Sequence, residues 1–331
     1  MNEKPIRASE FELIKRYFSP LARRERGALG LTDDAAHLHP RAGHEFVVTA
    51  DAIVEGVHFF NADPPFELAQ KALRVNLSDL AAKGAVPRAY MMTVSWPAWV
   101  TDSWIASFVK GLASDQDEFG IHLIGGDTVS TSGPLSISIT AIGEIQKGAM
   151  VKRSGARHGD LLWVSGTIGD AGLGLAVLKG ELQGLAPIDV DFLTRRFQVP
   201  EPRAGLTTML RKFAHASIDV SDGLVADVSH MAAASKLGVE IFGDRVPLSP
   251  AAKKVLEGRS FNLEQLVTAG DDYEIAFAAS ASEKKHILGV ARKSGIAVTE
   301  IGHFSRKAVG VTFFGANGQA LQIARKGFTH F

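Results

Sequence analysis

The clearest periodic pattern along the chain lies between residues 135 and 141, where apolar side chains alternate strictly with serine or threonine. A period of two predicts a strand with one buried face and one polar face. Apolar runs and helical spacing predict the other elements of the first half, namely strands at 46–51, 89–96 and 122–124 and helices at 66–83 and 104–119. Gly84 and Pro87 mark the end of the first of these helices.

The second half of the chain repeats this alternation of elements. A polar, glycine-rich stretch at 146–160 separates the two halves. The strands predicted after it are 161–165, 216–220, 239–242, 273–279 and 296–301, and the helices are 170–180, 191–212 and 224–237. Alternating strands and helices predict two α/β or α+β domains, which we place at 1–148 and 149–331.

The composition excludes several classes of protein. The chain has 331 residues, a length that favours two domains, and its 36 basic and 36 acidic residues cancel. A nucleic-acid partner normally requires a basic excess or a basic run, and the sequence has neither. There is no cysteine, which excludes disulfides, Cys-ligated metal centres and a cysteine nucleophile.

No segment has the pattern of a signal peptide or a membrane anchor. Residues 1–12 lack the apolar core of a signal peptide. The least charged stretch, 89–101, contains Pro97 and is shorter than the ~20 residues that span a bilayer. We therefore expect a soluble, cytoplasmic protein without a membrane partner.

Aspartates gather where apolar strands end, often beside glycine, rather than on helix surfaces. They are Asp33, Asp34, Asp51, Asp127, Asp219, Asp222, Asp271 and Asp272. Strand ends are where α/β folds assemble their sites. Any one of these acids is equally compatible with a turn or a helix N-cap, and Asp222 before Gly223 is the plainest example. The set as a whole favours a functional site.

Spacing within this set indicates oxygen ligands for hard cations. Residues i and i+2 of a strand share a face, so Thr49 points the same way as Asp51, and Asp219 the same way as Ser221. Each pair offers a hydroxyl and a carboxylate, which suit such cations. Asp79 lies on a predicted helix instead; a solvated helix face is the alternative there, although its neighbours are mostly apolar.

Converging carboxylates require compensating cations. Two like charges ~4 Å apart repel by about 4 kcal/mol at an effective dielectric constant of about 20. Mg²⁺ is usually held by one or two carboxylates together with phosphate oxygens. The acids therefore predict several metal ions with a polyphosphate, and a phosphoryl transfer that needs no covalent nucleophile on the protein.

Other phosphate-binding signatures are absent or weak. The chain has no G-x-x-x-x-G-K-[ST] motif and no H-R-D or D-F-G set. The glycine-rich turn at 165–174 follows a predicted strand and opens a helix, but such turns are common and a structural interpretation is favoured. His58 has no metal-ligand spacing around it, and taken alone it favours a structural role.

Motif-like segments recur from the first strand to the last residue. They are TDDAAHL (32–38), TADAIVEGVHF (49–59), KALRVNLSDLAAKGA (71–85), LIGGDT (123–128), VKRSGARHGD (151–160), VSGTIGDAGLGL (164–175), IDVSDGLVADVSH (218–230), GDDYEIAF (270–277) and KGFTHF (326–331). In this order they resemble the thiamine-monophosphate kinases, a family within the superfamily of aminoimidazole ribonucleotide synthetase and selenophosphate synthetase. EGVHF, NLSDLAA, GDDYE and the GF-x-HF ending point to the thiamine branch.

The resemblance implies ATP-dependent phosphorylation of thiamine monophosphate to thiamine diphosphate, by direct transfer of the γ-phosphate with Mg²⁺ ions between the two molecules. The implied metal ligands are Asp34, Thr49, Ala50, Asp51, Asp79, Asp127, Asp219 and Asp222. The implied ATP contacts are Gly126, Asp127, Arg153 and Ser221, and the implied substrate contacts are His58, Asp271 and Phe328. A basic surface loop is the alternative for Arg153, although its guanidinium fits phosphate in a bidentate manner.

The resemblance also implies the fold and the assembly. Residues 1–148 form an N-terminal metal- and ATP-binding domain with a mixed sheet and helices. This domain dimerises by packing sheets into a shared barrel, to which the strand at 135–141 contributes. Residues 149–331 form a C-terminal α/β sandwich-like domain that completes the nucleotide and substrate site.

Some positions depart from the usual family pattern: Thr32 stands for Gly, Ala50 for Thr, Asp271 for Glu and Phe328 for Trp or Tyr. At Ala50 only the backbone carbonyl could reach a metal ion. Two alternatives to the kinase remain, namely another ATP-using enzyme of the superfamily and a non-catalytic nucleotide- or metal-binding protein. The absence of cysteine disfavours the selenophosphate synthetase and hydrogenase-maturation branches.

Overall fold

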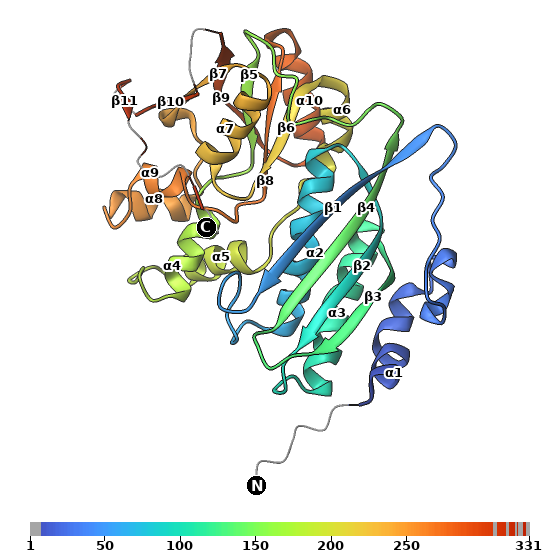
Figure 1. Cartoon of the computed structure of the whole chain (residues 1–331). Coiled ribbons are helices and arrows are strands. Elements are labelled where there is room, and N and C mark those ends of the chain that lie inside the picture. Colours follow the sequence, from blue (N-terminus) through green and yellow to red (C-terminus); the bar gives the residue numbers. More distant parts are fainter. Residues whose placement is uncertain (1–7, 307–309, 316–317, 322, 324–326, 329–331) are drawn as a thin grey trace. The chain divides into compact units, whose positions relative to one another are not determined.

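The structure is a computed structural model that describes residues 8–306, 310–315, 318–321, 323 and 327–328 (Figure 1). Within these ranges the chain divides into two compact units. The first unit is Met1–Leu80 with Ala85–Gly148, and the second is Ala81–Gly84 with Ala149–Phe331. The main crossing of the chain between the units lies between Gly148 and Ala149.

The first unit is a mixed sheet with helices. Its strands are β1 (His44–Val54), β2 (Val86–Trp96), β3 (His122–Ser130) and β4 (Ser136–Gln146), and its helices are α1 (Glu10–Leu13), α2 (Pro65–Ala82) and α3 (Asp102–Phe119), with shorter helical turns at Ile14–Phe18, Ser19–Ala22 and Arg26–Leu31. The strand order is β1-β4-β2-β3. Strand β4 is antiparallel to β1 and β2, whereas β3 is parallel to β2. β1 and β3 are therefore the opposite edges of this sheet.

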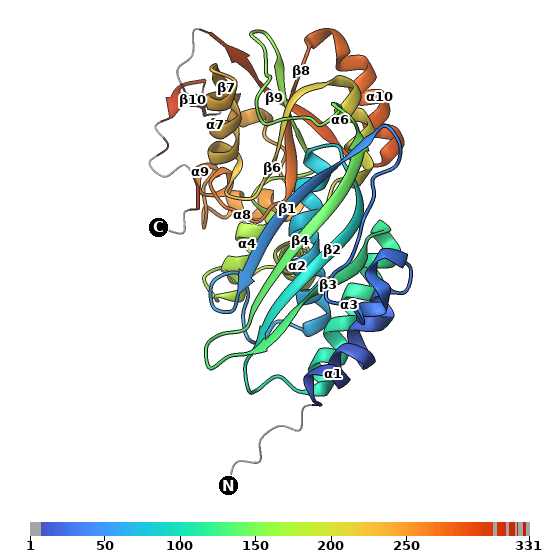
Figure 2. The ribbon, with the colours of Figure 1, turned by 45° about the vertical axis from the view of Figure 1, so that its right-hand side comes forward.

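The two faces of this sheet differ as the alternation at 135–141 predicts. The apolar residues of that run are buried, and the serine and threonine residues between them are partly exposed. Helices α2 and α3 cover the buried face (Figure 1, Figure 2). The other face, here called the outer face, carries Val48 and Met91, whose side chains are 60% and 44% exposed.

The second unit is a sheet between layers of helices. Its strands are β5 (Leu161–Ser165), β6 (Ala214–Val220), β7 (Gly238–Phe242), β8 (Glu274–Ala279), β9 (Val298–Ser305), β10 (Val311–Phe314) and β11 (Ala320–Leu321). Its helices are α4 (Asp170–Leu178), α5 (Pro187–Gln198), α6 (Thr207–Phe213), α7 (Leu224–Ala234), α8 (Pro250–Glu257), α9 (Leu263–Val267) and α10 (Lys284–Ser294). In the described residues the strand order is β11-β10-β7-β9-β5-β8-β6.

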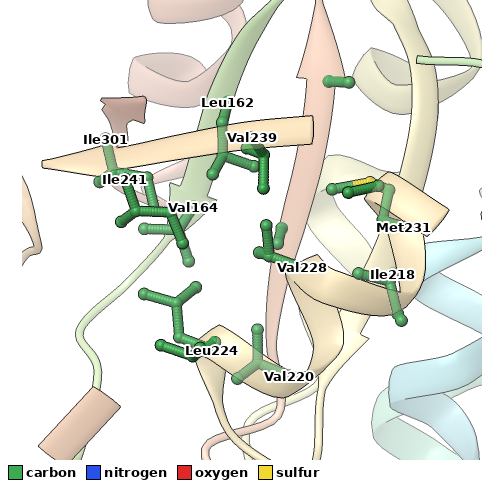
Figure 3. Close-up of a cluster of buried hydrophobic side chains, with 14 of the residues drawn as sticks. Leu162, Val164, Ile218, Val220, Leu224, Val228, Met231, Val239, Ile241 and Ile301 are labelled. Carbon is green, nitrogen blue, oxygen red and sulfur yellow. The ribbon is translucent and has the colours of Figure 1, made fainter. Parts of the chain in front are cut away.

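Alternate residues of single strands enter two separate cores of this unit. Leu162 and Val164 of β5 pack with Val228 and other residues of α7 on one face of the sheet (Figure 3). Trp163, between them in sequence, belongs to the core that α6 and α10 cover, and it stacks on Phe277 with 6.1 Å between ring centroids. Helices α6 and α10 lie side by side (Figure 2). The second unit is therefore a layered α/β sandwich, as predicted.

The prediction of one continuous helix over 191–212 is wrong. Helix α5 ends at Gln198 and α6 starts at Thr207, with Pro200 and Pro202 between them. Proline has no N–H for the helical ladder and clashes with the preceding turn, so the helix cannot continue through this segment. The predictions also omitted α8, α9 and α10. None of the helices in the described ranges combines the length and the apolar character that a membrane crossing needs.

The end of α2 belongs to the second unit, which the sequence did not indicate. Ala81 and Ala82 pack into the core beneath α6 and α10. The Lys83 ammonium donates to the backbone carbonyl of Ser217 over 2.7 Å, and the Ser217 hydroxyl donates to the carbonyl of Ala82. Residues 81–84 are thus tied to β6 and to the core beneath α6 and α10.

Candidate active site

Thr49, Asp51 and Asp79 form a compact group in the first unit. Thr49 and Asp51 lie on the helix-covered face of β1, between the buried residues Val47 and Ile53. The Thr49 hydroxyl donates to the carboxylate of Asp79 on α2. Burial, and then the negative charge of Asp79, raises the pKa of Asp51 from 3.8 to about 6. The protein alone therefore disfavours two charges here, and a cation would relieve the repulsion.

A second group lies at the β3 edge of the same unit. Asp33, Asp34, Gly126 and Asp127 line a cavity of about 710 Å³ between the N-terminal helical turns and strands β2 and β3. Much of the remaining lining is apolar and includes Trp96. The lining of the cavity therefore combines acidic groups with apolar side chains.

Gly126 occupies a position that tolerates no side chain. Its φ is 151°, and a Cβ there would lie 1.8 Å from the carbonyl oxygen of Met92 on β2. The next residue, Asp127, is exposed, and its carboxylate accepts the N–H of Thr128 over 2.8 Å. Strand pairing alone thus requires glycine at 126, whether or not a ligand lies against the same backbone.

The fold holds these two groups of the first unit apart. They lie at the β1 and β3 edges, which are separated by about 14 Å of sheet at ~4.8 Å per strand. Asp51 pairs with the buried Ile139, whereas Asp127 pairs with the exposed Thr93. Asp51 therefore faces the helices and Asp127 faces the outer side. The first unit of one chain does not unite all of its predicted ligands.

In the second unit, the predicted ligands gather on the loop after β6. Asp219 is the penultimate residue of β6, and Ser221 and Asp222 follow the strand directly. The Oδ2 atom of Asp227, in the first turn of α7, accepts the N–H groups of both Ser221 and Asp222 at 3.0 Å each. Helix α7 has Gly223 as its N-cap, so simple N-capping is not the role of Asp222.

Two predicted substrate contacts are tied to the same loop. The N–H of Asp271 donates to the carbonyl of Ser221 over 2.8 Å, and the N–H of Phe328 donates to the carbonyl of Asp222 over 2.9 Å. A Cβ on Gly327 would lie 2.4 Å from that carbonyl oxygen, so only glycine permits the approach. The Phe328 side chain is 42% exposed. The rest of the predicted segment 326–331 lies outside the described residues.

Asp227 is a residue that the sequence predictions missed. Burial raises its pKa from 3.8 to about 7, with the charge of Asp222 acting in the same direction. The N–H of Asp222 and the positive charge of Arg153 act in the opposite direction. Arg153 is exposed and near enough for its charge to affect Asp227. An acid in the first turn of a helix that follows S-D-G-L was the available sequence signal.

Two other predicted residues lie on or just after β1. The Nδ1 atom of His58 accepts the N–H of Val54 over 3.1 Å, which places the proton of the neutral ring on Nε2. Ala50 lies on the outer face, opposite Thr49 and Asp51. Its methyl group cannot be a ligand, so its backbone carbonyl is the only atom that could contact a metal ion.

A buried charge network lies at the start of β8. Glu274 is fully buried and accepts from the Ser165 hydroxyl at 2.6 Å, from Nε of Arg203 at 2.6 Å and from a guanidinium nitrogen of Arg196 at 2.9 Å. Burial alone would raise the pKa of Glu274, but Arg203 and Arg196 lower it. These partners lie 71 to 109 residues away in sequence, so no local pattern could have revealed them.

The glycine-rich turn at 165–174 has a structural partner. The N–H groups of Gly169 and Ala171, at the start of α4, donate to the buried carboxylate of Asp272 at 2.7 and 3.2 Å. These amides already have a protein acceptor. The geometry therefore supports the structural interpretation of this turn over a phosphate-binding one.

Across the described residues, no three His, Asp or Glu side chains converge closely enough to hold a metal ion by themselves. Mg²⁺ usually takes one or two carboxylates and completes its shell with water and phosphate. Groups such as Asp51 with Asp79 match that requirement better than they match an all-protein cage. The arrangement therefore suits metal ions that arrive with a phosphorylated ligand.

Comparison with known proteins gives matches along both units. A family model described as AIR synthase related protein, N-terminal domain, matches residues 32–145, and the corresponding C-terminal domain model matches residues 157–313. A thiamine-monophosphate kinase of Caulobacter vibrioides is 43% identical over 326 residues, which cover 97% of this chain and 91% of that protein.

Solved structures agree with these matches. The crystal structure of thiamine-monophosphate kinase from Stenotrophomonas maltophilia K279a has a TM-score of 0.83 and 38% identity, and covers 95% of this chain and 98% of its own. A structure described as AaThiL complexed with AMPPCP and TMP has a TM-score of 0.77 and 30% identity, and covers 93% of this chain and 98% of its own.

Proposed function

This chain belongs to the thiamine-monophosphate kinase family, and we propose that it transfers, in the cytoplasm, the γ-phosphate of ATP to thiamine monophosphate. An oxygen of the substrate phosphate forms a bond to the γ-phosphorus while the bond from that phosphorus to the β–γ bridging oxygen breaks. The products are thiamine diphosphate and ADP. We assign no covalent nucleophile, since positioning and charge neutralisation suffice for such a transfer. The complex of AaThiL with AMPPCP, an analogue of ATP, and TMP supports this choice of substrates.

The group of Thr49, Asp51 and Asp79 carries the proposal. Two carboxylates and a hydroxyl are held together on rigid elements, β1 and α2. Burial, and then the charge of Asp79, raises the pKa of Asp51 to about 6, so its ionised form is disfavoured unless a cation lies nearby. A structural role alone would not favour such an arrangement, because like charges destabilise the fold unless a cation offsets them.

The donor atoms of this group fit Mg²⁺, which prefers oxygen ligands. When bound, Mg²⁺ neutralises the charge of the phosphates that must approach each other. We assign to it Thr49, Asp51, Asp79 and the carbonyl of Ala50 from β1 and α2, Asp34 and Asp127 from the β3 edge, and Asp219 and Asp222 from the second unit. The protein contributes fixed oxygen atoms on strands and helices, which keeps the ligand geometry rigid.

The remaining residues are assigned to the two organic molecules. We assign Gly126, Asp127, Arg153 and Ser221 to ATP, with the guanidinium of Arg153 on phosphate oxygens. We assign His58, Asp271 and Phe328 to thiamine monophosphate. The aromatic face of Phe328 would attract the cationic thiazolium ring, a contact worth about 1–2 kcal/mol.

We infer that the active form is a homodimer whose site takes residues from both copies. The outer face exposes apolar residues such as Val48 and Met91, as expected of a surface that packs against a second sheet. In the barrel that we propose, the twofold axis runs along the barrel, which brings the β1 edge of each copy next to the β3 edge of the other. The edge that carries Asp51 would then adjoin the partner's edge that carries Asp127, whereas two strands separate these edges within one chain.

Subunit complementation tests this assembly. Asp79→Asn and Asp127→Asn should each abolish activity as separate homodimers. After the two variants are unfolded together and refolded, half of the dimers are mixed, and one of the two sites in each mixed dimer is intact. We expect recovery of about one quarter of wild-type activity. No recovery, with mixed dimers shown to be present by mass spectrometry, would mean that each chain builds its own site.

A direct assay tests the reaction itself. Purified protein is incubated with Mg²⁺, ATP and a panel of phosphate acceptors, and thiamine diphosphate and ADP are measured together. We expect turnover with thiamine monophosphate and equal amounts of both products. Turnover only with a different acceptor would identify another enzyme of the superfamily, and ATP binding without turnover of any acceptor would identify a binding protein.

A further inference from the structure

The turn before β8 has an unusual backbone. Asp271 and Tyr273 both have left-handed φ angles, of 70° and 50°, which non-glycine residues rarely adopt. Asp272 between them is fully buried. Strained backbone of this kind persists only where the surroundings hold it in place, and it concentrates at functional sites.

One side of this turn is held by the start of α4 and by α5. The carboxylate of Asp272 accepts the N–H groups of Gly169 and Ala171. The guanidinium of Arg196 on α5 donates to the Asp272 carbonyl over 3.1 Å, and it also binds Glu274. The central residue of the turn is thus fixed through both its side chain and its backbone.

The other side of the turn is held by the loop after β6. The N–H of Tyr273 donates to the carbonyl of Val220 over 2.8 Å. This hydrogen bond lies next to the one from the N–H of Asp271 to the carbonyl of Ser221. A Cβ on Gly270 would lie 2.6 Å from the Ser221 carbonyl oxygen, so the two loops approach as closely as backbones can. With both sides held, Asp271 has little freedom to change its direction.

The side chain of Asp271 is itself oriented by its neighbour. The hydroxyl of Tyr273 donates to Oδ1 of Asp271 over 3.4 Å. A substrate-binding carboxylate needs a fixed direction as well as a fixed backbone, because a displacement of about 1 Å can reduce activity on the order of 100-fold. Both requirements are met by residues that have no assigned contact with either substrate.

We propose that Asp272 and Tyr273 are positioning residues that fix the Asp271 carboxylate for thiamine monophosphate. The proposal rests on the proposed function, in which Asp271 contacts that substrate. Asp272 holds the left-handed turn through the amides of α4, and the Tyr273 hydroxyl sets the direction of the carboxylate. Their effect is therefore expected on the binding of thiamine monophosphate, with ATP binding little changed.

Steady-state kinetics of Tyr273→Phe provide the main test, since this change removes a single hydroxyl. We expect the KM for thiamine monophosphate to rise about three- to tenfold, the loss expected for one ordinary hydrogen bond, while the KM for ATP stays within about twofold. Tyr90→Phe is the control, because it too removes a single tyrosine hydroxyl, one that is buried and accepts from Gln116 in the first unit. It should leave both constants within about twofold of the wild type.

Asp272→Ala and Asp272→Asn test the anchor of the turn. We expect Asp272→Ala to raise the KM for thiamine monophosphate about tenfold or more, and Asp272→Asn, which keeps one acceptor oxygen, to restore part of the loss. As a second readout, the rise in Tm caused by thiamine monophosphate should shrink in Asp272→Ala while the rise caused by AMPPCP remains. If Asp272→Ala does not fold, Tyr273→Phe decides.

The outcomes separate this proposal from the proposed function. A wild-type protein that does not use thiamine monophosphate would overturn both. A wild-type protein that uses it, together with folded Tyr273→Phe and Asp272→Asn variants whose KM for thiamine monophosphate is unchanged, would overturn only the positioning role. Equal losses for both substrates would also contradict it, since they would indicate general disruption of the site.

Discussion

Replacing Glu274 by glutamine should destabilise the second unit strongly. Glu274 is fully buried between Arg196 and Arg203, whose side chains are 5% and 15% exposed. The change removes the buried negative charge between the two guanidinium groups and presents an amide NH₂ where an acceptor is needed. Glu201, whose side chain is 51% exposed, stays as an acidic partner of both arginines. Breaking a buried ion pair from one side costs about 3–5 kcal/mol, because the remaining charges stay desolvated. We expect a loss of free energy of unfolding in this range at pH 7.

The pH dependence sharpens this prediction. The folded state lowers the pKa of Glu274 below its ordinary value of 4.5, so its contribution is present above the unfolded pKa and is lost as the pH falls through the folded pKa. The difference in free energy of unfolding between the wild type and Glu274→Gln should therefore become smaller below pH 4.5. Denaturant unfolding at pH 7 and pH 4 measures this difference. Asp189→Asn is the control, because its ion-pair partner Lys254 is 56% exposed and such pairs contribute about 1 kcal/mol or less. The reasoning is refuted if Glu274→Gln costs no more than the control.

Two further predictions concern acids near the proposed metal ions. Asp79→Asn should lower kcat by orders of magnitude while the protein stays folded, which steady-state kinetics and circular dichroism measure. Glu67→Gln, on the same helix, is the control and should leave kcat unchanged. Retained activity in Asp79→Asn would remove Asp79 from the site. Asp227→Asn can keep both amide bonds, because a single oxygen accepts them. The pKa of Asp227 rises from 3.8 to about 7 on folding, so the wild type loses up to about 4 kcal/mol of stability as the pH rises through this window. Between pH 5 and 7 the free energy of unfolding of the variant should therefore rise relative to that of the wild type, as measured by denaturant unfolding with a chelator present. Parallel pH profiles of stability for the two proteins would contradict the assigned burial of Asp227.

Local sequence patterns correctly predicted those structural features that depend only on neighbouring residues in the chain. The alternation at 135–141 predicts the buried and outer faces of β4 because side chains of a strand alternate in any surroundings. Strand β1 spans His44–Val54, whereas the sequence predicted only 46–51. The prediction was too short because the polar residues Thr49 and Asp51 were interpreted as the end of the strand. In the structure they lie within the strand, on the face that α2 covers.

The predicted site shows the same limit. The pairing of Thr49 with Asp51 follows from a spacing of two residues, and the structure adds Asp79 from another element. The separation of Asp51 from Asp127 follows from the strand order β1-β4-β2-β3, which no local pattern encodes. The network around Glu274 was missed for the same reason, since its partners are set by the fold. Asp227 differs, because the amides that it accepts lie only five and six residues away and a local signal was available.

The most direct test of the account follows the fate of the γ-phosphate. The protein is incubated with Mg²⁺, thiamine monophosphate and ATP labelled at the γ-phosphorus, and the label is traced in nucleotide, thiamine diphosphate, inorganic phosphate and protein. The account predicts one labelled thiamine diphosphate for each ADP formed, with the label in the terminal phosphate and none on the protein at any time. Label that appears as inorganic phosphate without labelled thiamine diphosphate, or that passes through the protein, would contradict direct transfer.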